Sequence, residues 1–382
     1  MGEPGLIRSE PFRLFFPMGM LAGFVGVAHW GWYYSGIIDT YSCNYHGLMQ
    51  MQGFETAFVV GFMMTAIPRF LDTPFAATWE VGLAAALLIA TALLLRFERW
   101  EATEVSFILL MTHLSVFWLR RHLARRDDPP ALFSLIPVGL VLGLTGGLLI
   151  LYPPTGFVKL GHRMVEQGML LCFLMAFGSY LGRRLVEGAT TEELEGTAEG
   201  SGVIPAIILG VLLLLSFLIE SGFHEASGRL LRAATLTIFS FRVFPILRFP
   251  GVRGFTAWAL WLGFWLVLLG QWLAGLFPDY EIVALHLTFI GGFSLITMIV
   301  STRVIAAHCG PESIWNTKAR ALKALGLFVF AALISRASSD FMEWYYFGML
   351  HVASGFWMAA ALIWGFAYVP RMLRPTPSAD VA

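Results

Sequence analysis

Long apolar runs, each ended by a charged residue, Gly or Pro, constrain this chain more than any other feature of its sequence. A helix needs roughly 20 mostly apolar residues to cross a bilayer, and the hydrocarbon core offers its backbone no other hydrogen-bond partners. Runs of this kind fill most of the 382 residues, of which 57% are hydrophobic and 13% charged. Water-soluble domains have about a quarter of their residues charged. The sequence therefore predicts an integral membrane protein with almost nothing left for a soluble domain.

Twelve of the runs are long enough to be membrane-spanning helices. We expect these helices at about 14–34, 46–68, 78–95, 102–119, 131–152, 162–182, 203–220, 226–247, 255–276, 281–306, 321–338 and 341–369. The expected fold class is therefore all-α, a polytopic bundle of about twelve transmembrane helices.

The distribution of positive charge sets the expected orientation. With a cytoplasmic N-terminus, alternation of the helices places eighteen of the 25 Lys and Arg residues on the cytoplasmic side and seven on the outer side. Because cytoplasmic connections are enriched in Lys and Arg, we expect both termini in the cytoplasm. Acidic residues also number 25, so the charge balance favours no nucleic-acid partner, and the lipid bilayer is the expected partner.

The longest polar stretch lies near the middle of the chain. Residues 186–202, VEGATTEELEGTAEGSG, are acidic and rich in Gly and Thr, which is typical of a flexible cytoplasmic linker. We expect one transmembrane domain over 1–382, made of a six-helix half at 1–185, this linker, a second six-helix half at 203–374 and a tail at 375–382.

A spacing of Gly, fifteen residues and Arg occurs three times. It joins Gly53 to Arg69, Gly168 to Arg184 and Gly355 to Arg371. Such a pattern is consistent with an internal repeat. Membrane helices also commonly contain Gly and end in Arg, so the spacing alone does not establish one.

Histidine gives the strongest indication of chemistry, because ionisable residues inside a bilayer are costly and usually face a cavity or a partner. In the predicted topology, six of the nine histidines lie in the outer half of the membrane: His29, His46, His162, His224, His286 and His351. Imidazole is the usual ligand of haem iron and copper, so the group favours a metal site. The alternative is that these side chains lie at the membrane interface, as Trp and Tyr do.

The run that begins at His46 has features of a cofactor site. At about 100° per residue, His46, Gln50, Gly53 and Ala57 share one helix face, and the small residues leave room for a flat macrocycle or for close helix packing. Glu55 is expected on the opposite face, away from whatever His46 binds. It is either a proton-relay carboxylate or a neutral, hydrogen-bonded side chain.

The tenth run carries candidates at both of its ends. His286 and His308 are 22 residues apart, about 33 Å along a helix, so they cannot bind the same metal. Arg303 and His308, at the cytoplasmic end, are candidates for contact with a haem propionate, a second cofactor or a lipid phosphate.

Four segments of the chain resemble one known family. They are EPFRLFFPMG near the N-terminus, MQMQGFETAFVVGFMMTAIPRF after His46, HLTFIGGFSLITMIVSTRVIAAHCG in the tenth run and WMAAALIWGFAYVPRMLRP near the C-terminus. Together they are similar to the NnrS family of bacterial inner-membrane proteins, over nearly the whole chain. The resemblance implies haem and copper as cofactors, and a role in nitric oxide metabolism and nitrosative-stress resistance. The three cysteines have no CxxCH spacing, so the haem would be a non-covalent b-type haem.

The resemblance also implies particular residues. His46 matches the histidine of the second-span motif, and His286, Arg303 and His308 match conserved positions of the tenth. Many members have His-x-His-Glu-Met where this chain has residues 44–49, NYHGLM, so this segment lacks the first His and the Glu.

Three functions are compatible with these features. In the leading hypothesis the protein handles nitric oxide at a haem whose axial ligands are His46 with His286 or His351, while His162 and His224 bind copper. If it is an enzyme, it is a haem-dependent oxidoreductase that acts on nitric oxide and needs an unidentified electron donor. The first alternative is a transporter or channel for a metal, haem or an NO-derived complex, which a six-plus-six layout supports. The second is a sensor that binds nitric oxide without turnover; the oligomeric state stays open for all three.

Overall fold

The computed structural model describes residues 5–154, 157–190, 203–244 and 246–374, and for 243 and 311–318 it describes the backbone alone. Every regular element among these residues is a helix, which confirms the all-α prediction. The greater part of the predicted linker (191–202) and the predicted tail (375–382) lie outside the described residues.

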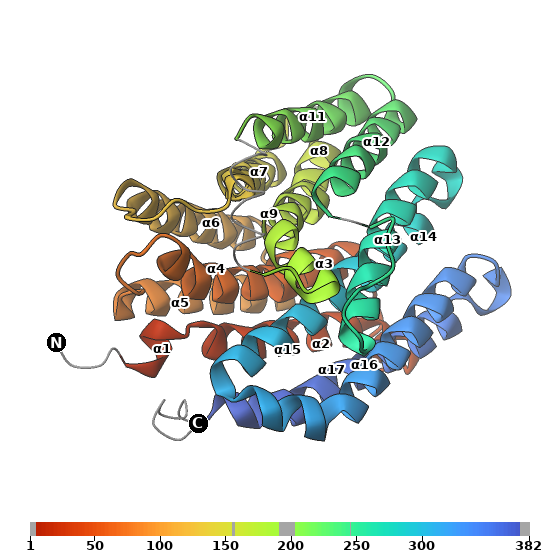
Figure 1. Ribbon diagram of the computed structural model, residues 1–382. Helices are drawn as coiled ribbons and strands as arrows, with labels where there is room; N and C mark the ends of the chain where they lie inside the picture. The colour runs from red at the N-terminus through yellow and green to blue at the C-terminus, as the bar shows by residue number, and fades with distance from the viewer. Residues whose placement is uncertain (1–4, 155–156, 191–202, 245, 375–382) are drawn as a thin grey trace.

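A short helix, α1 (Leu6–Ser9), precedes helical segments that run back and forth between the two ends of a bundle (Figure 1). The first four segments are α2 (Phe12–Tyr34), α3 (Cys43–Leu48) continued by η1 (Met49–Glu55) and α4 (Thr56–Phe70), α5 (Thr78–Arg96) and α6 (Trp100–Leu123). The next four are η2 (Ala131–Ser134) with α7 (Leu135–Leu151), α8 (Val158–Arg163) continued by η3 (Met164–Met169), α9 (Leu170–Gly182) and η4 (Arg183–Glu187), α11 (Val203–Gly222) and α12 (Glu225–Val243). The last four are α13 (Phe255–Leu276), η5 (Pro278–Tyr280) with α14 (Glu281–His286), η6 (Leu287–Ser294) and α15 (Leu295–Cys309), α16 (Pro311–Ser339), and η7 (Glu343–Tyr345) with α17 (Tyr346–Met372).

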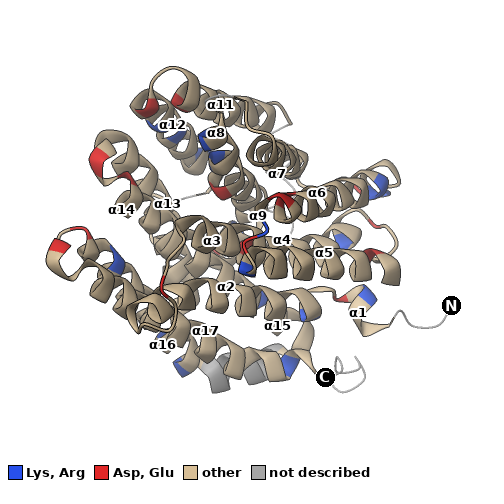
Figure 2. Ribbon diagram, turned by 180° about the vertical axis from the view of Figure 1, so that it is seen from behind, with Lys and Arg blue, Asp and Glu red and all other residues tan. Residues whose placement is uncertain are grey.

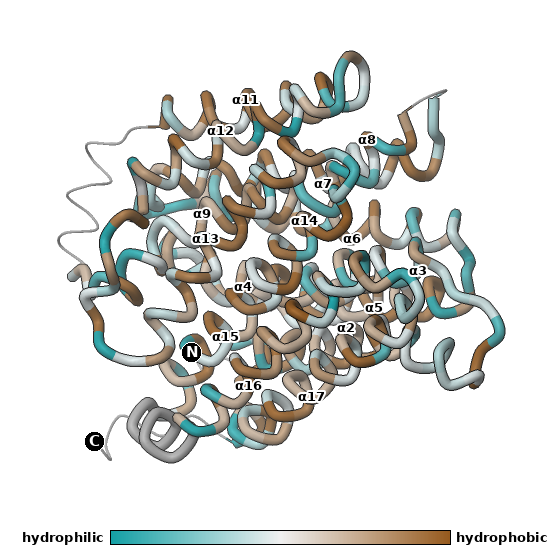
Figure 3. The backbone as a smooth tube through the Cα atoms, turned by 90° about the vertical axis from the view of Figure 1, so that its right-hand side faces the viewer, coloured by the Kyte–Doolittle hydropathy of each residue, from teal (hydrophilic) through white to brown (hydrophobic). Residues whose placement is uncertain are grey.

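Ten of the described segments are long and apolar enough to cross a membrane. Hydrophobic residues run along the middle of the helices (Figure 3), and charged residues gather mainly at helix ends (Figure 2). The segments outside the ten are Cys43–Phe70, which buries Gln52 and Glu55, and Glu225–Val243, which buries Arg229 and Arg232. The chain is therefore a polytopic membrane bundle, and the two segments outside the ten both carry charged side chains into the interior.

The packing groups the helices by fours. In each group the third and fourth helices pack as an antiparallel hairpin: α5 on α6, α11 on α12 and α16 on α17. These hairpins lie at three different parts of the periphery (Figure 1). The second segment of each group lies inside, and a cavity of about 110 Å³ among the three inner segments is lined by Phe58, Phe173 and Phe293. The predicted division into two halves stays a prediction beside this threefold grouping.

Each inner segment contains a π-helical stretch that begins within three residues after a histidine. The stretch η1 follows His46, η3 follows His162 and η6 follows His286. A π-turn closes hydrogen bonds to the fifth residue and thus holds one residue more than an α-turn. Because one residue corresponds to about 100° in an α-helix, each stretch turns the following helix face by about that angle.

Candidate functional site

A cavity of about 250 Å³ lies at the end of the bundle that the predicted topology places outside. His46 and His286, from two of the inner segments, both line it, together with Glu55, Glu166 and Arg336. Much of the remaining wall is aromatic or apolar, including Val27, Trp30, Phe54, Phe289, Leu350 and Trp357. The structure thus brings together two of the five histidines that the sequence analysis favoured as ligands.

The ring of His46 is held by a backbone carbonyl on the neighbouring helix. Its Nδ1 lies 3.0 Å from the carbonyl oxygen of Gly26 on α2. A carbonyl oxygen only accepts hydrogen bonds, so Nδ1 carries the proton and the lone pair stays on Nε2, which is the tautomer that binds metals. Gly26 makes this approach possible, because a Cβ there would lie 2.6 Å from Nε2 of Gln50 and 2.8 Å from Cγ of Met49.

Two hydrogen bonds hold the N-terminal end of α3, the short helix that contains His46. The Ser42 side chain caps the helix by accepting a hydrogen bond from the Tyr45 backbone N–H at 3.1 Å. The Ser42 backbone N–H donates to Nε2 of His29 on α2 at 2.7 Å. His29 thereby ties α2 to the first turn of α3, a structural use for one of the six outer histidines.

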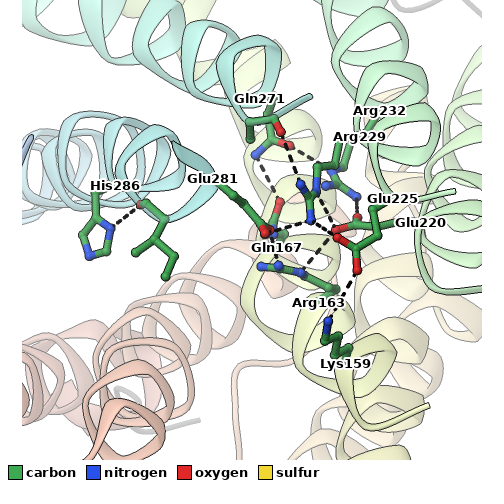
Figure 4. A network of polar contacts seen from close by, with 12 residues as sticks. Lys159, Arg163, Gln167, Glu220, Glu225, Arg229, Arg232, Gln271, Glu281 and His286 are labelled. Atoms are coloured by element: carbon green, nitrogen blue, oxygen red, sulfur yellow. Dashed lines mark hydrogen bonds and ion pairs between the residues drawn. The ribbon is translucent and has the colours of Figure 1, made fainter. Parts of the chain in front are cut away.

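His286 has the same tautomer by a different route. Its Nδ1 lies 2.6 Å from the carbonyl oxygen of Ile282, one turn earlier in α14 (Figure 4). The proton is again on Nδ1, which leaves the Nε2 lone pair available. Two histidines with the same available nitrogen therefore line one cavity.

Glu55 also lines this cavity, and our prediction that it projects away from what His46 binds is wrong. The prediction assumed an uninterrupted α-helix, in which nine residues make two and a half turns and so place Glu55 opposite to His46. The π-stretch η1 ends at Glu55 and turns it toward the cavity. One carboxylate oxygen, Oε2, accepts a hydrogen bond from the Thr297 hydroxyl at 2.7 Å. The other, Oε1, is buried without a hydrogen-bond partner among the described residues.

The small residues after His46 pack against α2. A Cβ at Gly53 would lie 3.1 Å from Cβ of Ala22, and Cβ of Ala57 is 2.9 Å from the position of a Cβ at Gly19. Of the two uses proposed for these residues, close helix packing is the one that the structure displays.

The other predicted ligands lie apart from this cavity. His162 does not line it, but its Nδ1 lies 3.4 Å from a carboxylate oxygen of Glu166, which does. His351 stacks on the ring of Tyr34 with 4.8 Å between centroids. His224 is exposed and caps α12 by accepting a hydrogen bond from the Ser227 backbone N–H. Within the described residues, no group of three or more His, Cys, Asp or Glu is placed to hold a metal ion.

Arg303 and His308 line a separate cavity at the opposite end of the bundle. Nδ1 of His308 lies 2.9 Å from Oε1 of Glu10, which precedes α2. Burial alone would raise the pKa of Glu10, but hydrogen bonds from His308 and Arg13 outweigh burial and lower it below its ordinary value.

A network of ion pairs gathers around Glu220 and Glu281, and Glu281 begins α14, the helix that ends at His286 (Figure 4). Glu220 on α11 accepts hydrogen bonds from Arg229 at 3.1 Å and from Arg232 at 2.6 Å. Arg229 also donates to Glu281 at 2.8 Å, and Glu281 pairs with Arg163 as well. The network joins α8, α11, α12 and α14, and it supplies the partners that the buried arginines of α12 need.

Sequence reasoning missed two charged residues of the cavity wall, Glu166 and Arg336. Glu166 lies one helical turn after His162, a spacing at which side chains meet. Arg336 is an arginine in the last turn of α16, after the apolar stretch 324–334. Both are ionisable residues in membrane-spanning segments, which is the signal that could have found them.

Comparison with known families gives one match. The family model described as NnrS protein matches residues 6–376. Among curated proteins, none matches the sequence. The matched region includes His46, His286, Glu55 and both ends of the bundle, and the chain accordingly belongs to the NnrS family, which is linked to the nitric oxide response.

Proposed function

We propose that this protein binds a non-covalent b-type haem in the histidine cavity and handles nitric oxide there by redox chemistry. The observation that carries the proposal is the matched pair of histidines. His46 and His286 line the same cavity, and each has Nδ1 held by a backbone carbonyl. A hydrogen bond that fixes the tautomer and orientation of the ring is the usual support of a metal-bound imidazole.

The residues of the cavity fit a haem. His46 and His286 present Nε2 as iron ligands, and the aromatic wall of Trp30, Phe289 and Trp357 suits an apolar ring system. Arg336 is 5% exposed, and its guanidinium would pair with a carboxylate of the ligand. When bound, haem supplies an iron centre that binds nitric oxide and exchanges one electron at a time.

Glu55 provides a position for a proton at the cavity wall. The Thr297 hydroxyl fixes one of its oxygens, and the other is buried. A carboxyl group in this position takes up a proton from the cavity or delivers one to it, as intramembrane carboxylates do in proton relays. The roles of His351, Arg303 and His308 in cofactor binding stay predictions, since these residues lie outside this cavity.

Copper is the less supported of the two cofactors. The described residues bring no three suitable ligands together. The pair formed by His162 and Glu166 offers two donors beside the cavity, and His224 lies at the N-terminus of α12. We retain His162 as the first candidate for a copper ligand and assign no chemical step to the metal.

We further propose that twelve helices span the bacterial inner membrane with both termini in the cytoplasm. Cys43–Phe70 and Glu225–Val243 would be the two spans beyond the ten segments that are long and apolar enough by themselves. The histidine cavity then faces the outer half of the membrane. Nitric oxide is small and apolar, so it reaches such a cavity through lipid without an aqueous channel, and an electron donor remains to be identified.

One feature favours a second candidate function, transport of a metal, haem or an NO-derived complex. Three cavities follow one another along the inner segments, and neighbouring ones share wall residues. Glu55 lines both the histidine cavity and the central cavity, and Phe62, Leu181 and Val300 line both the central cavity and the one at the opposite end. A row of this kind is what a transit path requires.

The test is the reduced-minus-oxidised absorption spectrum of the purified protein, with and without nitric oxide. We expect a b-type signal that changes on addition of nitric oxide and is lost in His46→Ala and in His286→Ala. His113→Ala is the matched control, because His113 also bonds a backbone carbonyl, that of Glu80 at 2.9 Å, but does not line the cavity. A full signal in both cavity variants, or equal loss in the control, contradicts the proposed site.

Turnover separates the two candidate functions. Consumption of nitric oxide by the haem-loaded protein with an electron donor supports the redox function. Flux of a metal through proteoliposomes that contain haem-free protein supports transport instead.

A further inference from the structure

A second cavity, of about 650 Å³, lies at the end of the bundle opposite to the histidine cavity. Each of the three inner segments contributes one arginine to its wall: Arg69 ends α4, Arg184 lies in η4 and Arg303 lies in α15. His308 completes the group. The residues are far apart in the chain, so tertiary packing brings them together.

The spacing along the inner segments explains this convergence. Arg69 follows His46 by 23 residues, and Arg184 and His308 follow His162 and His286 by 22 residues each. Three segments that start with a histidine at one end therefore present a cationic or imidazole side chain at the other. The same grouping by fours that builds the histidine cavity also assembles this one.

Among the described residues that line this cavity there is no Asp or Glu. Its remaining residues are mainly apolar or aromatic, such as Phe62, Phe70, Leu185 and Val304. Guanidinium groups that face one cavity without a carboxylate in its wall repel one another, and an anion that enters removes this cost.

The arginine at the end of α4 is held in position by its own surroundings. Nη1 of Arg69 donates to the carbonyl oxygen of Thr65 at 2.6 Å, and its guanidinium lies 5.2 Å from the centre of the Phe75 ring. A guanidinium fixed in this way has N–H groups left for a ligand, and its planar fork matches the oxygens of a phosphate.

We propose that this cavity binds a phosphate group through Arg69 and Arg184. The phosphate belongs either to the headgroup of an anionic phospholipid or to a soluble phosphate ion. The apolar walls suit the first source, and the cytoplasmic position expected for this end of the bundle suits both. The proposal does not depend on haem binding in the histidine cavity.

The experiment compares two double variants of the full chain in detergent. Arg69→Gln/Arg184→Gln removes two charges from the cavity, and Arg248→Gln/Arg253→Gln removes two exposed charges from the connection between α12 and α13 at the same end. Binding is measured from the rise in thermal unfolding temperature with added phosphatidylglycerol, phosphatidylcholine or inorganic phosphate. Phosphatidylcholine controls for lipid without net charge.

We expect phosphatidylglycerol or inorganic phosphate to stabilise the wild type, and the cavity variant to bind at least about tenfold more weakly, since two charge-assisted hydrogen-bond donors are lost. Stabilisation by phosphatidylglycerol alone identifies a lipid, and stabilisation by inorganic phosphate identifies a soluble ion; either supports the site. If neither probe stabilises the wild type, or if both double variants weaken binding equally, the proposal is wrong.

A charge-preserving variant covers the case in which the glutamine variant does not fold. Arg69→Lys/Arg184→Lys keeps both charges but loses the fork, so we expect binding between that of the wild type and that of the glutamine variant. Wild-type affinity in both the lysine and the glutamine variants overturns the proposal. Haem content, measured in parallel from the absorption spectrum, should be unchanged, so the outcome is independent of the histidine cavity.

Discussion

The two ends of this bundle use arginine in opposite ways. At the end with the histidine cavity, Arg229 and Arg232 are 2% and 1% exposed, and both pair with Glu220. At the other end, Arg69 and Arg184 line a large cavity, and no carboxylate is found among the described residues of its wall. In the first group, carboxylates of the protein itself balance the charges of the arginines. The second group provides a surface for an anion from outside.

This difference separates a structural role from a binding role. A buried charge that loses its partner is strongly destabilising, so a closed network holds helices in place. Arginines that line a cavity and form no ion pair within the described part of the chain, such as Arg69 and Arg184, should contribute less to stability and keep their charges available for a ligand. Substitutions at the two ends should therefore change the free energy of unfolding by different amounts.

The largest effect is expected from Glu220→Ala. The substitution leaves Arg229 and Arg232 buried without their shared carboxylate, and removal of one partner of a buried pair costs about 3–5 kcal/mol. The measurement is the free energy of unfolding in mixed micelles. Glu225→Ala is the control, because the Glu225 side chain is 55% exposed and its pair with Arg229 should be worth less than about 1 kcal/mol. Equal losses of unfolding free energy in the two variants would show that the buried arginines do not depend on Glu220.

The second-largest effect is a partial recovery of the free energy of unfolding in the double variant Glu220→Met/Arg232→Met. Removal of both a buried cation and its anion avoids an unpaired charge, and such exchanges are often neutral or stabilising. We expect the double variant to be at least about 1 kcal/mol more stable than Glu220→Met alone. A double-mutant cycle with Arg232→Met measures this coupling, and strict additivity of the single costs would contradict it.

The third effect concerns the opposite end. Without added anion, Arg69→Gln/Arg184→Gln should change the free energy of unfolding by less than about 1 kcal/mol, in either direction, because mutual repulsion is relieved. Added sodium chloride should stabilise the wild type more than this variant, since salt screens exposed like charges. A loss comparable to that of Glu220→Ala would place these arginines in a structural network.

The smallest effect is a pH dependence at Glu10, which bonds His308 beside the second cavity. The pKa of Glu10 is lowered in the folded protein, so its contribution to stability is complete above its ordinary pKa of 4.5 and is lost as the pH falls through the lowered value. Glu10→Gln should therefore remove part of the loss of stability below about pH 5. Identical acid unfolding curves for the variant and the wild type would contradict this assignment.

Much of the fold and a part of the site follow from the sequence. Apolar runs predict the helices because each span must bury a stretch of fixed length in lipid, and His46 and His286 stand out because charge and imidazole are rare there. The face of Glu55 could not be predicted, since the π-stretch before it leaves no mark in hydrophobic periodicity. That Arg69 and Arg184 line the same cavity depends on which helices are neighbours, and only tertiary packing decides that.

The spacing of Gly and Arg occurs on helices in different positions of the bundle. Gly53 to Arg69 and Gly168 to Arg184 lie on two of the inner segments, whereas Gly355 to Arg371 lies on α17, the last helix of its group. The third inner segment has His308 one residue before its end. The internal repeat therefore stays a hypothesis, because a pattern of two residue types does not depend on where a helix lies in the bundle.

The π-stretches have a consequence for how relatives of this protein should be aligned. The stretch η1 has seven residues and η3 has six, and one residue more or fewer in such a stretch turns the following helix face by about 100°. For a relative whose stretch differs from η1 by one residue, an alignment without a gap inside the helix would match Glu55 with a residue that faces elsewhere. A gap placed within the helix would restore the match.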